Sequence, residues 1–228
     1  MDGNYMKKTV TLCVKKNKHS KGVSKAFTLA ETLITLVMIG VIAAMTVPAV
    51  KNHTEEVRYV AQVKKAYADI SNATGILETK YGDCRFWSFG TAGGWDQNAD
   101  VVSWYKKTMN ATPTINHTDS ALSKEGGSPV SFTTADGMAW SLFPGGYASG
   151  GVALVDVNGD EGPNVKGIDI HGFRIGKSEA DNESGVFALG DGVNDKNSVW
   201  SCTPYAINHG KMPWLSGGDP DCNNYYKK

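Results

Sequence analysis

The feature that most constrains this chain is a run of 24 residues, positions 27–50, whose single ionisable side chain is Glu31. As a helix rising about 1.5 Å per residue, the run would extend about 36 Å, enough to cross a hydrocarbon core of about 30 Å. Seven of the 23 Lys and Arg residues precede it, which places the N-terminus in the cytoplasm by the positive-inside rule. The sequence therefore predicts one membrane-spanning helix followed by an extracytoplasmic remainder.

Two simpler interpretations compete with a specialised one: a cleaved secretory signal peptide and a plain membrane anchor. The apolar part of a secretory signal has about 7–15 residues, so this run is too long for one. A carboxylate in lipid is costly and usually has a partner, and a plain anchor has no use for Glu31. If the chain were cut between Ala26 and Phe27, the new amine of one copy could pair with Glu31 of a neighbour. Within one helix, geometry prevents the same two groups from satisfying each other.

The residues around this point resemble the prepilin peptidase site of type IV pilins and type II secretion pseudopilins. The family pattern is a small residue, normally Gly, followed by Phe-Thr-Leu-x-Glu; here Ala26 precedes the run from Phe27 to Glu31. Gly40 and Pro48 continue the resemblance. It implies that a membrane aspartyl peptidase cuts after Ala26 and methylates the amine of Phe27, and that Glu31 serves assembly.

The same resemblance implies a fold and a set of partners. The expected fold is α+β and pilin-like, with a long N-terminal helix packed on a small antiparallel β-sheet head. The expected partners are other pilin or pseudopilin subunits, the prepilin peptidase and an inner-membrane assembly platform. The implied function is that of a structural subunit of a type IV pilus or a type II secretion pseudopilus.

Four segments follow from these expectations: a cytoplasmic leader at 1–26, the membrane and assembly helix at 27–50, its amphipathic continuation at 51–81, and a globular head at 82–228. Pro48 lacks an N–H and Gly40 weakens a helix, so we expect a kink or local melting near Met45. Beyond it, apolar residues recur at three- and four-residue steps, the period of one helical face. They are Val57, Val60, Val63, Tyr67, Ile70, Thr74, Leu77 and Tyr81.

The head reads as short strands joined by loops. β-favouring residues alternate or cluster at 130–134, 138–143, 152–157, 168–175 and 186–189. Ala135-Asp136-Gly137 separates the first two segments and is a hairpin signal. The order of the strands is not predicted.

Three cysteines remain once the leader is removed: Cys84, Cys202 and Cys222. A bond between Cys202 and Cys222 closes a loop of 19 residues, which stabilises a fold by about 3 kcal/mol in the chain-entropy model. Pilins often carry such a C-terminal bridge, so we favour this pairing. Pairing of Cys84 with either of the others stays open, as does the role of Cys84.

Oxygen-bearing side chains stand at alternate positions in 155–164, as they do in calcium loops. The candidate ligands are Asp156, Asn158, Asp160 and Asp169. The segment is not an EF-hand, because Glu161 stands where Gly is expected and Gly167 where a bidentate Glu is expected. Some pseudopilins bind calcium in their heads, which is the functional interpretation; a polar turn after a strand is the simpler one.

No G-x-S-x-G, C-x-x-C, P-loop or H-E-x-x-H motif is present, and no residue is proposed as catalytic. His171 and Asp169 fall on one face of a predicted strand and are expected to form a surface pair. Residues after position 26 carry excess acid, so nucleic acid is not expected as a direct partner. The alternative function is a monomeric membrane-anchored module that binds a glycan or protein through exposed Trp95 and Trp214; an anchored hydrolase ranks third. Pilus and secretion roles, and major and minor subunits, are not distinguished.

Overall fold

The protein is described by a computed structural model over residues 27–89, 100–112, 122, 130–144, 150–159, 161–177, 183–190, 200, 202–216 and 222. Its contacts divide the chain into two compact units, Met1–Met45 and Thr46–Lys228. The second unit includes both the predicted amphipathic segment and the predicted head. The leader lies outside the described residues.

Helix α1 spans Leu29–Tyr81 and has 53 residues, which confirms the predicted long helix. The expectation of local melting near Met45 is wrong, because α1 is helical through Met45 and Pro48. Proline fits the helical φ angle and removes one hydrogen bond, the one to the carbonyl of Ala44, while the flanking hydrogen bonds hold the turn. A kink at Gly40 and Pro48 stays a prediction.

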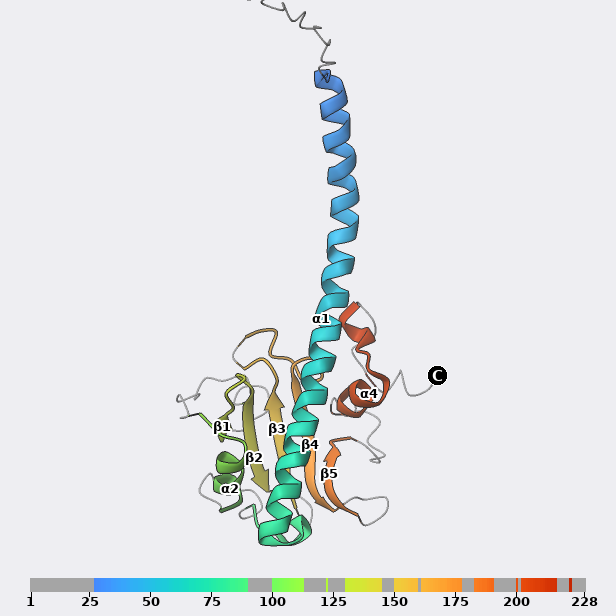
Figure 1. Cartoon of the computed structure of the whole chain (residues 1–228). Helices are drawn as coiled ribbons and strands as arrows, with labels where there is room; N and C mark the ends of the chain where they lie inside the picture. Colours follow the sequence, from blue (N-terminus) through green and yellow to red (C-terminus); the bar gives the residue numbers. More distant parts are fainter. Residues whose placement is uncertain are drawn as a thin grey trace, which may run out of the picture. The chain divides into compact units, whose positions relative to one another are not determined.

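The sheet of the second unit has five antiparallel strands in the order β1-β2-β3-β4-β5, so each strand pairs with its neighbour in sequence (Figure 1). All five strands overlap predicted segments, and together with α1 they confirm the α+β class. Their bounds are Phe132–Thr133 for β1, Ala139–Pro144 for β2, Gly150–Asp156 for β3, Ile170–Lys177 for β4 and Ser184–Ala188 for β5.

The predicted hairpin between β1 and β2 is confirmed. Phe132 pairs with Trp140, and the Thr134 N–H donates to the Met138 carbonyl at 3.0 Å. Gly137 has a φ of 88°, in the left-handed region that a residue with a side chain adopts only with strain. The glycine of the hairpin signal therefore stands where the turn needs it.

Within the second unit, α1 lies along one face of the sheet (Figure 1). The ring of Tyr67 lies 5.8 Å from that of Phe173 on β4, and its hydroxyl donates to the Val186 carbonyl on β5 at 3.3 Å. The predicted apolar stripe is correct in its middle and wrong at its ends, since Val57 is 56% exposed and Tyr81 38% exposed. The buried residues of α1 are Tyr59, Val60, Val63, Ala66, Ile70, Ala73, Thr74 and Leu77.

The head also contains helices, so its description as strands and loops is incomplete. The additional elements are α2 (Asp100–Thr108), α4 (Cys202–His209) and the 3-10 turns η1 (Cys84–Phe86) and η3 (Pro213–Ser216). Helices this short have little stability of their own and form because tertiary contacts bury one face. In α2 the buried residues are Val101, Val102 and Tyr105. Taken by themselves, these residue types favour a β-strand.

Cys202 and Cys222 form a disulfide with a Cα–Cα distance of 5.1 Å, the pairing favoured from the sequence. Cys84 is a buried free thiol. Trp214 is not an exposed contact: it is buried, and its indole Nε1 donates to the Gly167 carbonyl at 3.0 Å. Trp95 lies outside the described residues.

Candidate functional site

The first turn of α1 is a capping box built from Thr28 and Glu31. Thr28 directly precedes the helix, and its N–H and its hydroxyl both donate to Glu31 Oε2, at 2.8 and 2.9 Å. The Glu31 N–H donates in return to Thr28 Oγ1 at 3.2 Å. This reciprocal pattern satisfies backbone donors that a helix start otherwise leaves open.

The capping box changes what Glu31 implies. A plain membrane anchor also gains a helix cap from this carboxylate, so the expectation that an anchor has no use for Glu31 is wrong. Both hydrogen bonds nevertheless fall on Oε2. Within the described part of the chain, Oε1 has no hydrogen bond and carries charge for a further cation.

The other hydroxyls near this site are satisfied by the helix itself. Thr32 Oγ1 donates to the Leu29 carbonyl at 2.9 Å, and Thr35 Oγ1 donates to the Thr32 carbonyl at 2.9 Å. Such back-bonding lets a hydroxyl enter an apolar medium without an unpaired donor. Glu31 is therefore the only residue at 27–50 that brings a charge to the segment.

Side chains at positions 27–50 are all exposed, and most of them are apolar. Among the described residues, α1 is the one helix long and apolar enough to cross a membrane by length and composition. Water-soluble proteins rarely leave contiguous apolar surfaces of this extent uncovered. This surface therefore needs lipid or other protein around it.

The candidate calcium turn between β3 and β4 is braced by its own hydrogen bonds. Asp169 is completely buried, and its two oxygens accept the N–H groups of Asn164 and Val165, each at 2.7 Å. The Asn158 amide donates to the Glu161 carbonyl at 2.9 Å. Burial raises the pKa of Asp169, and the two N–H donors oppose that shift. Asp169 acts here as a brace for the backbone.

The remaining groups of the turn fit a cation incompletely. Asp160 lies outside the described residues, and Asp156 accepts the Asn158 N–H at 3.3 Å. Two buried oxygens, Asn158 Oδ1 and Asn164 Oδ1, have no partner in the part of the chain that the structure describes. Two neutral amide oxygens supply little of the charge that calcium sites use. The described residues fit the polar-turn interpretation better than a calcium loop.

We expect calcium to leave the stability of this protein unchanged. The Asp169 carboxylate is buried and already accepts two backbone N–H bonds, so the turn is held without an ion. The measurement is the thermal unfolding midpoint of the full chain in detergent, with EDTA and with millimolar calcium. Magnesium at the same concentration controls for ionic strength. A saturable rise in the midpoint with calcium alone would restore the metal interpretation.

A second acidic group, Glu78, Asp83 and Cys84, also brings possible ligand atoms within 4.8 Å of one another. Asp83 is paired with the Arg85 guanidinium. Burial raises the pKa of the Cys84 thiol to about 12, so the thiol is protonated at neutral pH. Glu78 Oε1 accepts the Cys84 N–H at 3.0 Å, so both carboxylates of this group have partners within the chain.

The expected surface pair of His171 and Asp169 is wrong. Both side chains are completely buried, and they bond to different groups. The imidazole contacts Thr203 and the Ile168 carbonyl, whereas the carboxylate binds backbone N–H groups. The alternation of side chains along a strand predicted that the two residues share a face of the sheet. It did not predict that α4 covers that face.

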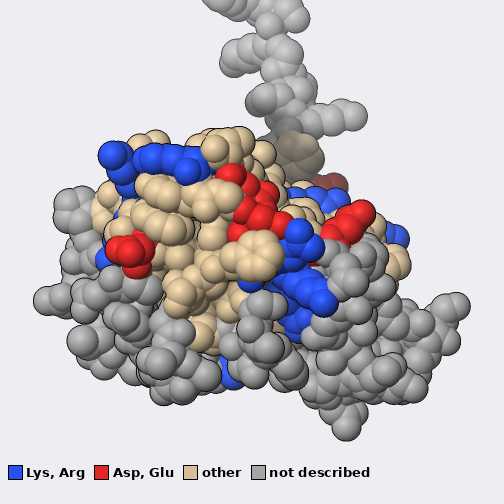
Figure 2. Space-filling model, turned by 90° about the horizontal axis from the view of Figure 1, so that it is seen from below, with Lys and Arg blue, Asp and Glu red and all other residues tan. Residues whose placement is uncertain are grey.

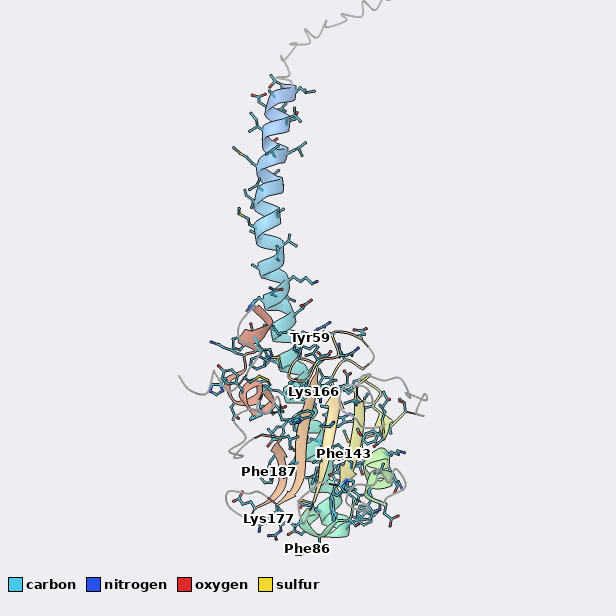
Figure 3. The ribbon with its side chains drawn as sticks, turned by 180° about the vertical axis from the view of Figure 1, so that it is seen from behind. Tyr59, Phe86, Phe143, Lys166, Lys177 and Phe187 are labelled. Atoms are coloured by element: carbon cyan, nitrogen blue, oxygen red, sulfur yellow. A yellow bond between two sulfur atoms is a disulfide. The ribbon has the colours of Figure 1, made fainter. Side chains whose placement is uncertain are left out.

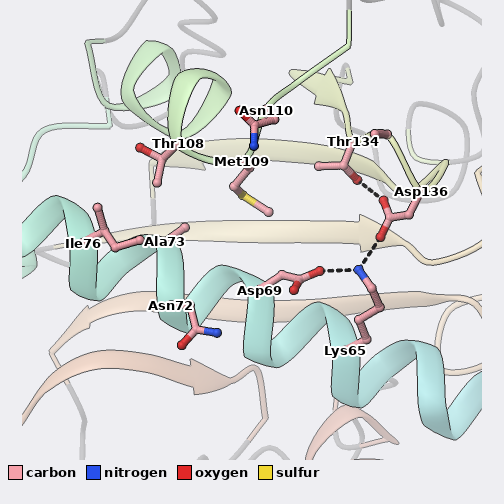
Figure 4. Close-up of a pocket in the computed structure, with 11 residues that line it drawn as sticks. Lys65, Asp69, Asn72, Ala73, Ile76, Thr108, Met109, Asn110, Thr134 and Asp136 are labelled. Carbon is pink, nitrogen blue, oxygen red and sulfur yellow. Dashed lines mark hydrogen bonds and ion pairs between the residues drawn. The ribbon is translucent and has the colours of Figure 1, made fainter.

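A pocket of about 360 Å³ opens between α1, the end of α2 and the β1–β2 turn (Figure 4). At one end, Lys65 Nζ lies 2.6 Å from Asp69 Oδ2 and also pairs with Asp136. These charges largely neutralise one another, and the described residues that line the pocket include no Ser, Cys or His. Sequence reasoning missed it because its walls come from three separate elements.

Charges of both signs share the face of the head shown in Figure 2, where Lys and Arg lie beside Asp and Glu. On the described part of that face, charges of the two signs therefore partly offset each other.

The chain matches no protein-family model, no curated protein and no solved structure.

Proposed function

We propose that this chain is a pilin-like structural subunit, cut after Ala26 and assembled through its N-terminal helix into a type IV pilus or a type II secretion pseudopilus. The single observation that carries the proposal is the exposed apolar segment at 27–50, whose one carboxylate keeps an oxygen unused. Before assembly the segment spans the bacterial inner membrane, with the N-terminus cytoplasmic and the head outside. The role is mechanical and not catalytic.

The geometry of Glu31 supports pairing between subunits. Cleavage after Ala26 creates an amine on Phe27, one residue before the cap. In its own chain, the position beside Glu31 Oε2 is already filled by the N–H and hydroxyl of Thr28. The amine of a neighbouring copy can approach Oε1 instead. In an apolar environment, the amine and the carboxylate neutralise each other, and neither charge is left unpaired. The pairing therefore favours the assembled state over separate subunits.

Gly40 gives independent support. A Cβ added at this position would meet nothing within 4 Å in the chain, so the chain's own packing does not require glycine. Gly also weakens a helix by about 1 kcal/mol relative to Ala. With Ala44 it forms the small-xxx-small spacing that lets two helices approach closely in a membrane. A close contact with another helix therefore accounts for glycine at position 40.

One observation favours the alternative, a membrane-anchored binding module. Phe86 is 84% exposed on the η1 turn, at the end of the head that also carries Lys177 (Figure 3). The turn is held by the buried Cys84 before Phe86 and by the buried Trp87 after it. A rigidly presented aromatic ring is typical of protein and glycan contacts. Under this alternative, Phe86 replaces Trp214 as the exposed aromatic contact.

The mature N-terminus tests the proposal. When the chain is co-produced with a prepilin peptidase, we expect intact-mass and N-terminal peptide analysis to find a chain that begins at methylated Phe27. An Ala26→Gly variant, which restores the family's usual residue, should be cut at least as completely. An Ala26→Phe variant, too large for a small-residue site, should remain uncut. A wild-type chain that keeps Met1 with an active peptidase present would favour the plain anchor.

A further inference from the structure

The one completely buried histidine among the described residues joins the sheet to the C-terminal helix. His171 on β4 has its Nε2 3.0 Å from the Ile168 carbonyl and its Nδ1 3.2 Å from Thr203 Oγ1 on α4. Thr203 Oγ1 also lies 3.4 Å from the Gly172 N–H. The imidazole is thus the middle of a short hydrogen-bonded chain between two elements.

The polarity of this series of hydrogen bonds fits a neutral imidazole with every hydrogen bonded. A carbonyl can only accept, so Nε2 carries a hydrogen and donates to Ile168. The Gly172 N–H can only donate, so the Thr203 hydroxyl accepts from it and directs its own hydrogen to Nδ1. A proton added at Nδ1 would face that hydroxyl hydrogen. The Thr203 hydroxyl would then have to turn its hydrogen away and accept from Nδ1, which takes from that hydrogen its present acceptor inside the protein.

The contact lies in a segment that other hydrogen bonds also attach to the head. Thr203 follows Cys202, so it stands in the first turn of α4 beside the disulfide to Cys222. Farther along, the Met212 N–H donates to Glu56 Oε1 at 2.8 Å, and Trp214 bonds the Gly167 carbonyl. Gly167 and Ile168 belong to one turn. Losing the His171 contact therefore loosens α4 and the turn together.

The ionisable groups on the surrounding elements have other partners. In the turn before β4, Asp169 binds two backbone N–H groups, and Lys166 lies 5.6 Å from the Trp200 ring. On α4, His209 stacks on Tyr205 at 4.2 Å. On α1, Glu56 binds Met212, Glu55 pairs with Lys51, and Arg58 lies over Tyr59. Across the sheet, β3 places Val155 opposite the histidine. Within the described ranges, none forms an ion pair with the imidazole.

We propose that His171 is an acid-sensitive latch, which holds α4 and its disulfide loop on the sheet while neutral and releases them when protonated. The inference concerns the head alone and does not depend on the proposed assembly function.

The direction of the pH dependence follows from burial. Desolvation lowers the pKa of His171 from its ordinary 6.5 to about 4. The opened segment binds the proton more readily, so the closed form has its full stability above pH 6.5. That stability is lost as the pH falls from 6.5 toward 4. Over this interval the opening equilibrium rises by up to about tenfold per pH unit for one proton.

Access to the disulfide measures the opening, because Cys202 and Cys222 are both buried. We would treat the full chain in detergent with a phosphine reductant at pH 7, 6, 5 and 4.5. Reduced Cys202 and Cys222 are then quantified by alkylation and mass spectrometry. Relative to a His171→Gln variant, the wild type should be reduced at least about tenfold faster at pH 4.5 than at pH 7. Using the variant as reference cancels the reductant's own pH dependence.

The matched control is His209→Gln, which changes an exposed histidine on the same helix and should keep the wild-type response. Equal pH dependence in wild type and His171→Gln would overturn the proposal. If His171→Gln does not fold, NMR titration of ¹³C-labelled histidines in the wild type decides. One imidazole that stays neutral down to pH 5 supports the latch, whereas ordinary titration of every histidine overturns it.

Discussion

Replacing Glu31 with Gln should reduce incorporation of this chain into filaments at least about tenfold, while membrane insertion and the start of α1 stay intact. Glutamine fits the capping box, because its amide oxygen accepts from the Thr28 N–H as the carboxylate does. It removes only the charge, which the proposed pairing with the Phe27 amine of a neighbour requires. Losing one partner of a desolvated charge pair costs more than one factor of ten in an equilibrium.

The measurement compares the variant in sheared filament fractions with the variant in alkali-resistant membranes. Thr28→Val is the matched control, because it removes the hydroxyl of the cap and keeps the charge of Glu31. We expect its incorporation to fall less than that of Glu31→Gln. Glu31→Ala removes cap and charge together and should be the most impaired. If Glu31→Gln assembles as well as wild type while Glu31→Ala does not, Glu31 acts only as a cap.

Replacing Phe173 with Ala should lower the free energy of unfolding of the head by about 3–5 kcal/mol. The ring is completely buried on β4, 5.8 Å from Tyr67 on α1 and 6.4 Å from Trp140 on β2. Truncation removes its apolar contacts and leaves a cavity between the helix and the sheet. The surrounding rings are large and rigid, so little of that cavity can collapse.

Denaturant unfolding of the full chain in detergent, followed by tryptophan fluorescence, measures this loss. Phe86→Ala is the control, because the same side chain is removed from a site that is 84% exposed. Its effect should stay within about 0.5 kcal/mol. Similar losses for the two variants would show that Phe173 does not couple α1 to the sheet. If Phe86→Ala instead abolished a binding activity without loss of stability, the binding-module alternative would gain support.

Local periodicity accounts for the parts of the fold that could be predicted. The apolar run at 27–50 and the stripe after it specify a helix, and α1 ends at Tyr81, the predicted limit of the amphipathic continuation. Alternation placed the five strands, and Gly137 marked the first hairpin. Each of these signals depends on residues close together in sequence.

Predictions failed where the neighbours of a residue come from distant segments. Ala66 and Ala73 are buried because α1 approaches the sheet there, while Val57, at the correct spacing, is exposed. Trp214 suggested an exposed contact by its turn-rich surroundings, yet the Gly167 carbonyl holds its indole inside. His171 was expected on the surface, yet Thr203 of α4 contacts its imidazole and the side chain is completely buried.

The sequence alone determined that this protein has a long apolar helix with one carboxylate near its start, followed by an α+β head. Composition and the spacing of apolar residues are enough for this prediction, because water, lipid and backbone geometry act on each segment separately. Only the tertiary structure decided where buried polar groups far from their partners in sequence are bonded: His171 contacts Thr203 of α4, and the Trp214 indole donates to the Gly167 carbonyl. The energy of a buried polar group depends on its partners, and folding brings those partners from elsewhere in the chain.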